Sequence, residues 1–143
     1  MSDQKLQLIS FSPTGGTEKI LRAAALGISR DVAHHDLLKA APKGETIFGP
    51  ERVALIGMPV FAGRLPALAA ERLQCFHGRD CPAVLMVVYG NRAYEDALVE
   101  LNDLAENRGF RPVAAAAFVA LTSWKAPAWA VVIAASLIGW AVL

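Results

Sequence analysis

The chain has 143 residues, 55% of them hydrophobic, and its 14 Lys and Arg residues against 13 Asp and Glu give a net charge of +1. A chain of this length can bury a substantial core as one domain, and the near-zero charge excludes the basic footprint of a nucleic-acid-binding protein. The two cysteines, Cys75 and Cys81, are too few for a disulfide framework and lack metal-binding spacing, so we expect both to be reduced.

The first predicted elements are a strand and a helix joined by a short turn. Alternating apolar residues predict a strand over residues 5–11, and apolar residues recur at helical spacing from Thr17 onward. The turn between them is rich in hydroxyls and glycines. Unpaired N–H groups and the positive end of the helix dipole favour an anion there, and the glycines let the backbone come close to it. The predicted phosphate ligands are Ser12, Thr14, Gly15, Gly16 and Thr17.

The turn contains neither the Walker pattern nor the G-x-G-x-x-G pattern. A nucleoside triphosphate or a dinucleotide is therefore disfavoured, and a phosphate monoester carried on a larger cofactor is favoured. The alternative is an ordinary N-capped turn with no ligand.

Further along the chain, strand and helix patterns alternate. Apolar runs predict strands over residues 31–38, 51–58, 83–89 and 112–119, and helical periodicity covers residues 65–76 and 93–108, with Gly109 as a C-terminal stop. Residues 39–50 predict a loop. The continuous apolar runs at 53–56 and 83–88 are typical of central strands that are covered on both faces. The pattern predicts an α/β fold with a doubly wound, five-stranded parallel sheet. His34 and His35 are adjacent and should lie on opposite faces of their strand.

Two later segments, residues 57–66 and 89–94, follow predicted strands as the glycine-rich turn does. With these three segments in this order, the chain resembles the flavodoxins, whose phosphate loop reads Ser/Thr-x-Thr-Gly-x-Thr. The likeness is closest to flavodoxin-like domains found alone or fused to ferredoxin-type modules, and it covers about residues 5–119. The resemblance implies the strand order 2-1-3-4-5, with a ligand bound beyond the carboxyl ends of the strands.

The resemblance also implies an FMN cofactor and its contacts. Phe61 and Tyr94 would stack on the flavin ring, with plain core packing as the alternative, and Gly63 would allow a peptide rearrangement on reduction. Arg64 and Arg92 lie in the same loops and either influence the reduction potential, contact a partner, or carry solvent-facing charge. The implied flavin-contacting residues are Met58, Pro59, Phe61, Gly63, Tyr89, Gly90, Asn91 and Tyr94.

The function implied is that of an electron carrier between redox protein partners, rather than an enzyme with its own substrate, and no catalytic residue or metal ligand is assigned. Two alternatives stay open. One is a non-catalytic flavodoxin-fold interaction module tethered to a membrane, and the other is an NAD(P)H-dependent quinone reductase, whose nicotinamide site the sequence does not locate. The acidic residues Asp96, Glu100 and Asp103, together with Glu95 and Glu106, form either a local docking face or a solvated helix face.

The tail departs from the family pattern. We divide the chain into a flavin-binding domain over residues 1–122 and an apolar C-terminal helix over residues 123–143. From Ala126 to Leu143 there is no charged residue, and a helix of that length would extend roughly 27 Å, close to the hydrocarbon thickness of a bilayer. The tail is a final sheet-covering helix, a membrane anchor or an altered C-terminus. The first residues lack a secretory segment, so we expect a cytoplasmic domain, anchored to a membrane if the tail inserts.

Overall fold

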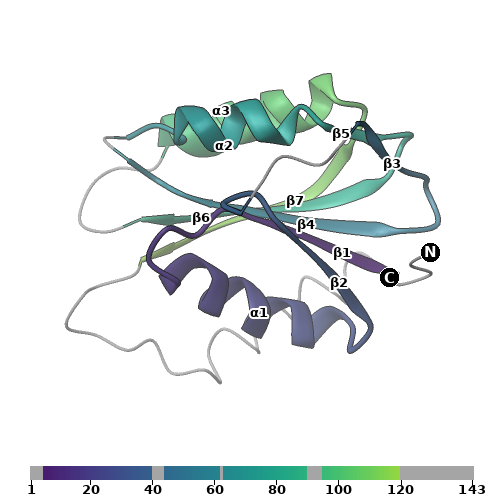
Figure 1. The fold of residues 1–143 in the computed structure, drawn as a ribbon, viewed down its shortest axis with the longest axis horizontal. Coiled ribbons are helices and arrows are strands. Elements are labelled where there is room, and N and C mark those ends of the chain that lie inside the picture. The colour runs from purple at the N-terminus through teal and green to yellow at the C-terminus, as the bar shows by residue number, and fades with distance from the viewer. Residues whose placement is uncertain (1–4, 40–43, 62, 90–94, 120–143) are drawn as a thin grey trace.

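The computed structural model describes residues 5–39, 44–61, 63–89 and 95–119 (Figure 1). Its main sheet has five parallel strands in the order β2-β1-β4-β6-β7, which confirms the predicted order 2-1-3-4-5. The strands of this sheet are β1 (Leu6–Ser10), β2 (Val32–Asp36), β4 (Val53–Pro59), β6 (Pro82–Tyr89) and β7 (Arg111–Val119).

Helices cover both faces of the sheet. α1 (Gly16–Ile28) lies on one face, and α2 (Ala67–Leu73) and α3 (Glu95–Asn107) lie together on the other (Figure 1). Every residue of β4 is buried, and β6 is buried up to Val88, as the continuous apolar runs predict for central strands.

Two apolar clusters, one on each face, make up the core. The cluster under α1 includes Leu8, Leu21 and Leu55, and the larger cluster under α2 and α3 includes Ile56, Met58 and Leu101. On the α1 face, a Cβ added at Gly57 would lie 2.2 Å from Cδ2 of Leu21. The missing side chain of this glycine therefore allows α1 to pack closely on β4.

A second, two-stranded parallel sheet was not predicted. It pairs β3 (Thr46–Phe48) with β5 (Phe76–Gly78). The prediction of a loop over residues 39–50 is wrong for β3, and the helix predicted to reach residue 76 ends at Leu73. The physical reason is tertiary: Phe48 and Phe76 are buried, and their rings stack with centroids 6.0 Å apart.

The predicted stop at Gly109 is confirmed. The N–H of Gly109 donates to the carbonyl of Glu106, and the N–H of Phe110 donates to the carbonyl of Ala105, both at 3.0 Å. This pair of bonds is a Schellman motif, and its left-handed residue is Gly109, at φ +87°.

The predicted C-terminal helix, and with it the division of the chain at residue 122, lies outside the described residues. Within the described ranges, no helix combines the length and apolar character needed to cross a membrane.

Candidate functional site

β1, β4 and β6 are neighbouring parallel strands, so all three end at the same carboxyl edge of the sheet. In the strand register, Ser10 of β1 lies beside Gly57 of β4, and Pro59 of β4 lies beside Val88 of β6. Beyond β1, the N–H of Phe11 donates to the carbonyl of Gly57 at 3.2 Å. The glycine-rich turn and the segment after β4 therefore leave neighbouring strands at the same edge.

The glycine-rich turn opens directly into α1. Gly15 is the N-cap, at φ +84°, a left-handed conformation that favours glycine, and an added Cβ there would meet no atom within 4 Å. The N–H of Lys19 donates to the carbonyl of Gly15 at 3.1 Å. Among the described residues, no hydrogen-bond acceptor meets the amides of Gly16 and Thr17. The helix thus begins with two backbone donors available to a ligand.

The three hydroxyls of this turn have different surroundings. Ser12 is buried, and its Oγ accepts a hydrogen bond from the N–H of Glu18 at 2.9 Å. Thr17 is also buried, whereas Thr14 is exposed. The predicted cradle therefore contains one exposed hydroxyl, that of Thr14, beside the open amides, and the hydroxyl of Ser12 already caps the helix.

The segment after β4 makes a tight turn. Phe61 and Arg64 exchange two backbone hydrogen bonds, of 2.8 and 3.0 Å, and Gly63 between them has φ +80°, in the region that favours glycine. Phe61 is 50% exposed. The alternative that Phe61 is a core residue is therefore wrong, because the turn holds its ring at the surface.

The other predicted flavin contacts differ in burial, and some of them lie outside the described residues. Met58 is fully buried in the cluster under α2 and α3, and Pro59 is also buried, both within β4 rather than in the turn. Tyr89 is half-buried at the end of β6. The predicted contacts Gly90, Asn91 and Tyr94, together with Arg92, lie outside the described residues.

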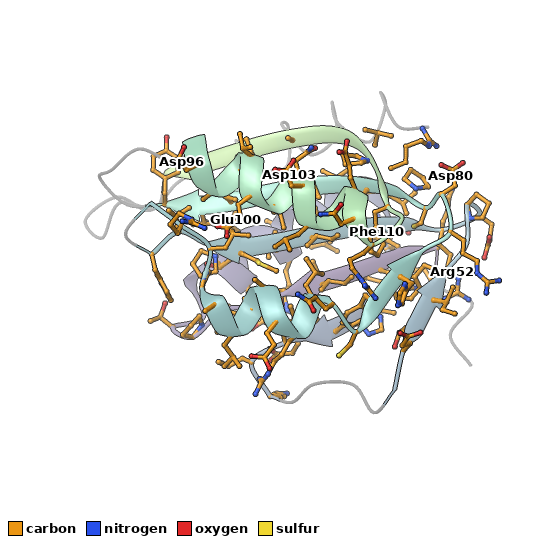
Figure 2. All side chains as sticks on the ribbon, turned by 90° about the horizontal axis from the view of Figure 1, so that it is seen from above. Arg52, Asp80, Asp96, Glu100, Asp103 and Phe110 are labelled. Carbon is orange, nitrogen blue, oxygen red and sulfur yellow. The ribbon has the colours of Figure 1, made fainter. Side chains whose placement is uncertain are left out.

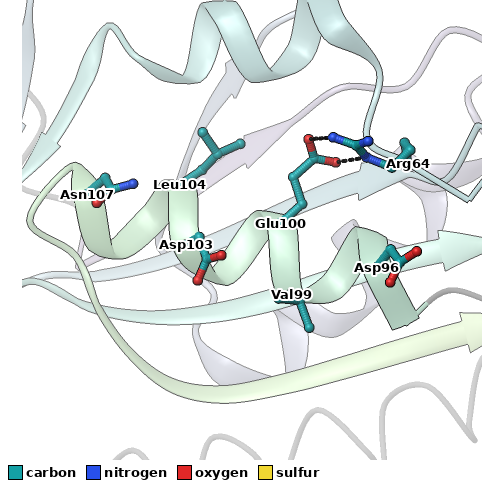
Figure 3. A pocket seen from close by; sticks show the side chains of 7 residues that line it. All are labelled: Arg64, Asp96, Val99, Glu100, Asp103, Leu104 and Asn107. Atoms are coloured by element: carbon teal, nitrogen blue, oxygen red, sulfur yellow. Dashed lines mark hydrogen bonds and ion pairs between the residues drawn. The ribbon is translucent and has the colours of Figure 1, made fainter.

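Arg64 is bound to α3 (Figure 3). Its Nε and Nη2 donate to Oε1 and Oε2 of Glu100 at 3.2 and 3.0 Å, and the backbone N–H of Leu65 donates to the same Oε1 at 3.0 Å. The hydrogen bonds from Arg64 lower the pKa of Glu100, with the Leu65 amide contributing in the same direction. Arg64 thus faces solvent, with a side chain that is 67% exposed, and its charge is paired with that of Glu100.

The sequence predicts Glu100 only as part of an acidic face. Asp96, Glu100 and Asp103 do follow one another along α3 (Figure 2), and with Val99 they line an open hollow of about 410 Å³. No local signal joins Glu100 to Arg64, since they are 36 positions apart in the sequence. The available signal is indirect: an acidic residue on the helix and a basic residue in the turn after β4, two segments that the parallel topology brings together.

The two adjacent histidines of β2 point to opposite faces, as predicted. Nε2 of His35 lies 2.8 Å from Oε1 of Gln7, and its ring packs against Phe48 and Phe76. On the α1 face, Nε2 of His34 lies 2.7 Å from Oγ of Ser10. Burial is the main reason that the pKa values of both histidines are lowered.

The residues around His34 include a serine and a glutamate, but they do not form a hydrolytic triad. Nη2 of Arg22 lies 3.0 Å from Nδ1 of His34, and because a guanidinium only donates, Nδ1 is the acceptor. In the neutral ring Nε2 then carries the proton and donates it to Ser10, the reverse of what a general base requires. Ser10 is also only 1% exposed, so a substrate could not reach it.

No family model and no curated protein sequence matches the chain. Solved structures do match its fold. A flavodiiron core from Synechocystis sp. PCC6803 is 17% identical with a TM-score of 0.62, over 99% of this chain and 36% of that one. Oxidised flavodoxin 1 from Bacillus cereus is 14% identical with a TM-score of 0.69, over 96% and 95% of the two chains. A flavoprotein in complex with FMN from Lactobacillus acidophilus NCFM is 15% identical with a TM-score of 0.55, over 80% and 93%.

This chain thus spans about a third of the flavodiiron core and nearly the whole of the flavodoxin. Together with the strand order β2-β1-β4-β6-β7 and helices on both faces, these likenesses establish that the chain has the flavodoxin-like fold.

Proposed function

We propose that this chain binds FMN at the carboxyl edge of its sheet and carries electrons between redox protein partners. The observation that carries the proposal is the pairing of two features on neighbouring strands. One is the N-terminus of α1, where the amides that follow the N-cap Gly15 are available to a ligand. The other is the exposed side chain of Phe61 in the turn after β4. The first suits a phosphate and the second suits the flat face of a ring.

The residues at the start of α1 fit a phosphate group. The amides of Gly16 and Thr17 and the hydroxyl of Thr14 are donors, and the helix dipole adds positive potential. Glu18 in the first turn is the one nearby carboxylate among the described residues of this helix, and Arg22 pairs with it at 3.0 Å. Its charge is therefore offset, and repulsion of a phosphate is reduced.

The turn after β4 fits the ring. Stacking on an exposed aromatic side chain contributes roughly 0.5–1.5 kcal/mol beyond the burial of area. Gly63 can change the orientation of its peptide at small cost because glycine tolerates both signs of φ. A bound flavin would supply the electron chemistry, and the chain would bind the flavin and shield it from water. The family resemblance adds Gly90 and Asn91, which lie outside the described residues, as further residues that would contact the flavin.

The experiment is a titration of purified protein with FMN and with riboflavin, followed by visible absorption. A phosphate site predicts tighter binding of FMN than of riboflavin. Gly15→Ala should remove this difference, and Gly44→Ala is the matched control, because Gly44 has nearly the same φ, +86° against +84°, and the same open surroundings. Loss of flavin binding in both variants alike would indicate general destabilisation rather than a phosphate contact.

Other outcomes separate the alternatives. A folded protein that binds no flavin would favour the non-catalytic interaction module. Steady oxidation of NADPH with a quinone as acceptor would favour the quinone reductase. Membrane association through residues 126–143 is a separate proposal, supported by their uncharged sequence, and co-sedimentation of the full chain with lipid vesicles tests it.

A further inference from the structure

The carboxylate of Glu100 accepts three hydrogen bonds that connect α3 to the turn after β4; those from Arg64 are drawn in Figure 3. Two come from the guanidinium of Arg64 and one from the backbone N–H of Leu65. We refer to residues 61–65 as the ring turn. At its end, Leu65 is buried in the core cluster, whereas Phe61 at its start is half exposed.

In the part of the chain that the structure describes, the ring turn has few other backbone connections. The backbones of Phe61 and Arg64 bond to each other across the turn, and the neighbouring Val60 bonds to Val88 of β6 at 2.9 Å. Those bonds fix the shape of the turn and its start. Among the described residues, the side chain of Glu100 accepts the hydrogen bonds that fix the other end, at Arg64 and Leu65.

An isolated ion pair at the surface contributes little to stability. This contact differs because the acceptor is shared with a backbone amide, and because the fork of the arginine meets both carboxylate oxygens, which fixes direction as well as distance. The side chain of Glu100 is 27% exposed, although that of Arg64 is 67% exposed. The effect of this contact should therefore appear in the position of the turn rather than in the stability of the fold.

We infer that Glu100 is a positioning residue for the flavin: it holds the ring turn so that Phe61 presents its ring at the carboxyl edge, and it neutralises Arg64 there. The inference rests on the proposed function. It assigns to α3 a part in cofactor binding beyond its role in covering the sheet. It also assigns the basic residue of the turn a pairing role, in place of a direct effect of its charge on the flavin.

Two consequences distinguish this role from a purely structural one. Loss of Glu100 should weaken binding of FMN and of riboflavin by the same factor, because the turn faces the ring that both share. It should also leave Arg64 uncompensated, and an added positive charge near the flavin favours its reduced, more negative form, so the reduction potential should rise.

The experiment measures FMN and riboflavin affinity and the reduction potential for the wild type, Glu100→Ala, Glu100→Gln and Asp103→Asn. Asp103 is the matched control, since it lines the same hollow on the same helix but makes no hydrogen bond to the described residues of the turn. We expect Glu100→Ala to weaken the binding of both flavins about five- to tenfold, because the ring turn loses its charge-assisted hydrogen bonds to Glu100. Glu100→Gln keeps an acceptor for Leu65, so it should bind better than Glu100→Ala while still raising the potential. Asp103→Asn should match the wild type.

Thermal unfolding of each apoprotein checks that the variants are folded. Equal affinities and potentials for Glu100→Ala and Asp103→Asn would overturn the inference and leave the proposed function intact. A weaker affinity for FMN alone would also overturn it, because the defect would then lie at the phosphate. If the wild type binds neither flavin, the proposed function fails, and this inference fails with it.

Discussion

Oγ of Ser12 accepts a hydrogen bond from the backbone N–H of Glu18, 2.9 Å away. The N-cap of α1 is Gly15, which has no side chain, so a residue three positions earlier caps the third residue of the helix. The turn is folded back on the helix start by this bond, and the amides of Gly16 and Thr17 remain available. Capping and ligand binding are therefore divided between Ser12 and Thr14.

Two substitutions in the glycine-rich turn should separate these roles. Ser12→Ala removes the cap and should lower the free energy of unfolding by about 1 kcal/mol, since the amide of Glu18 loses its acceptor. Thr14→Val removes an exposed hydroxyl and should leave stability unchanged while weakening FMN binding. Urea unfolding of the apoproteins measures the first effect, and flavin titration measures the second. A stability loss in Thr14→Val as large as that in Ser12→Ala would contradict the division.

The sequence predicted most of the main sheet because periodicity and apolar runs are local signals. The strand predicted over residues 83–89 corresponds to β6 (Pro82–Tyr89), and that over residues 31–38 to β2 (Val32–Asp36). The glycine-rich turn and the stop at Gly109 were also predictable, since each depends on a residue type that a specific backbone conformation requires.

The features that the sequence did not predict depend on contacts between distant segments. The strand β3 has only three residues, too few to show a period, and it forms because Phe48 meets Phe76. The pairing of Glu100 with Arg64 likewise joins α3 to a turn far away in the sequence. Nor does sequence alone distinguish an exposed Phe61 from a buried one, because both occur after an apolar strand.

Substitution of Gly109, at the end of α3, should lower the free energy of unfolding more than substitution of Gly44. A Cβ added there would lie 2.0 Å from the carbonyl oxygen of Gly78, a backbone atom that cannot move aside, and the residue also has φ +87°. Gly44 has φ +86° with open space around it. Gly44→Ala should cost roughly 1–2 kcal/mol from conformation alone, and Gly109→Ala should cost clearly more, as urea unfolding would measure. Equal costs would show that the contact with Gly78 relaxes.

Acidification should destabilise the fold through His34. Burial lowers the pKa of His34 below its usual value of 6.5, with Arg22 acting in the same direction and Glu18 and Asp36 opposing it. The unfolded chain therefore binds a proton at His34 more readily than the folded chain does. The contribution of His34 to the free energy of unfolding is fully present above pH 6.5, and it is lost as the pH falls below that value.

Burial also lowers the pKa of His35, so the two histidines add to the same slope. Urea unfolding between about pH 8 and pH 5 should show stability decreasing toward acid, and His34→Gln should reduce that slope. This window lies above the range where most carboxylates titrate. A slope that His34→Gln leaves unchanged would contradict this assignment.

The two cysteines should differ in reactivity. Burial raises the pKa of the Cys81 thiol to about 11, and its Sγ donates to the carbonyl of Arg52 at 3.3 Å, whereas Cys75 is only half-buried near the end of α2. Since the thiolate is the reactive form, a thiol reagent at about pH 8 should label Cys75 first.

The two thiols can be tested one at a time. Folded Cys75→Ser protein, which retains only Cys81, should react slowly and gain full reactivity in denaturant, and Cys81→Ser protein should react without it. The pKa of Cys81 in the folded protein lies above the usual value of 9.0. The contribution of this thiol to stability is therefore present below pH 9.0 and is lost as the pH rises toward about 11. Labelling of folded Cys75→Ser protein at the rate of the denatured chain would show that Cys81 is accessible, and the core cluster in which it is buried would then have to open readily.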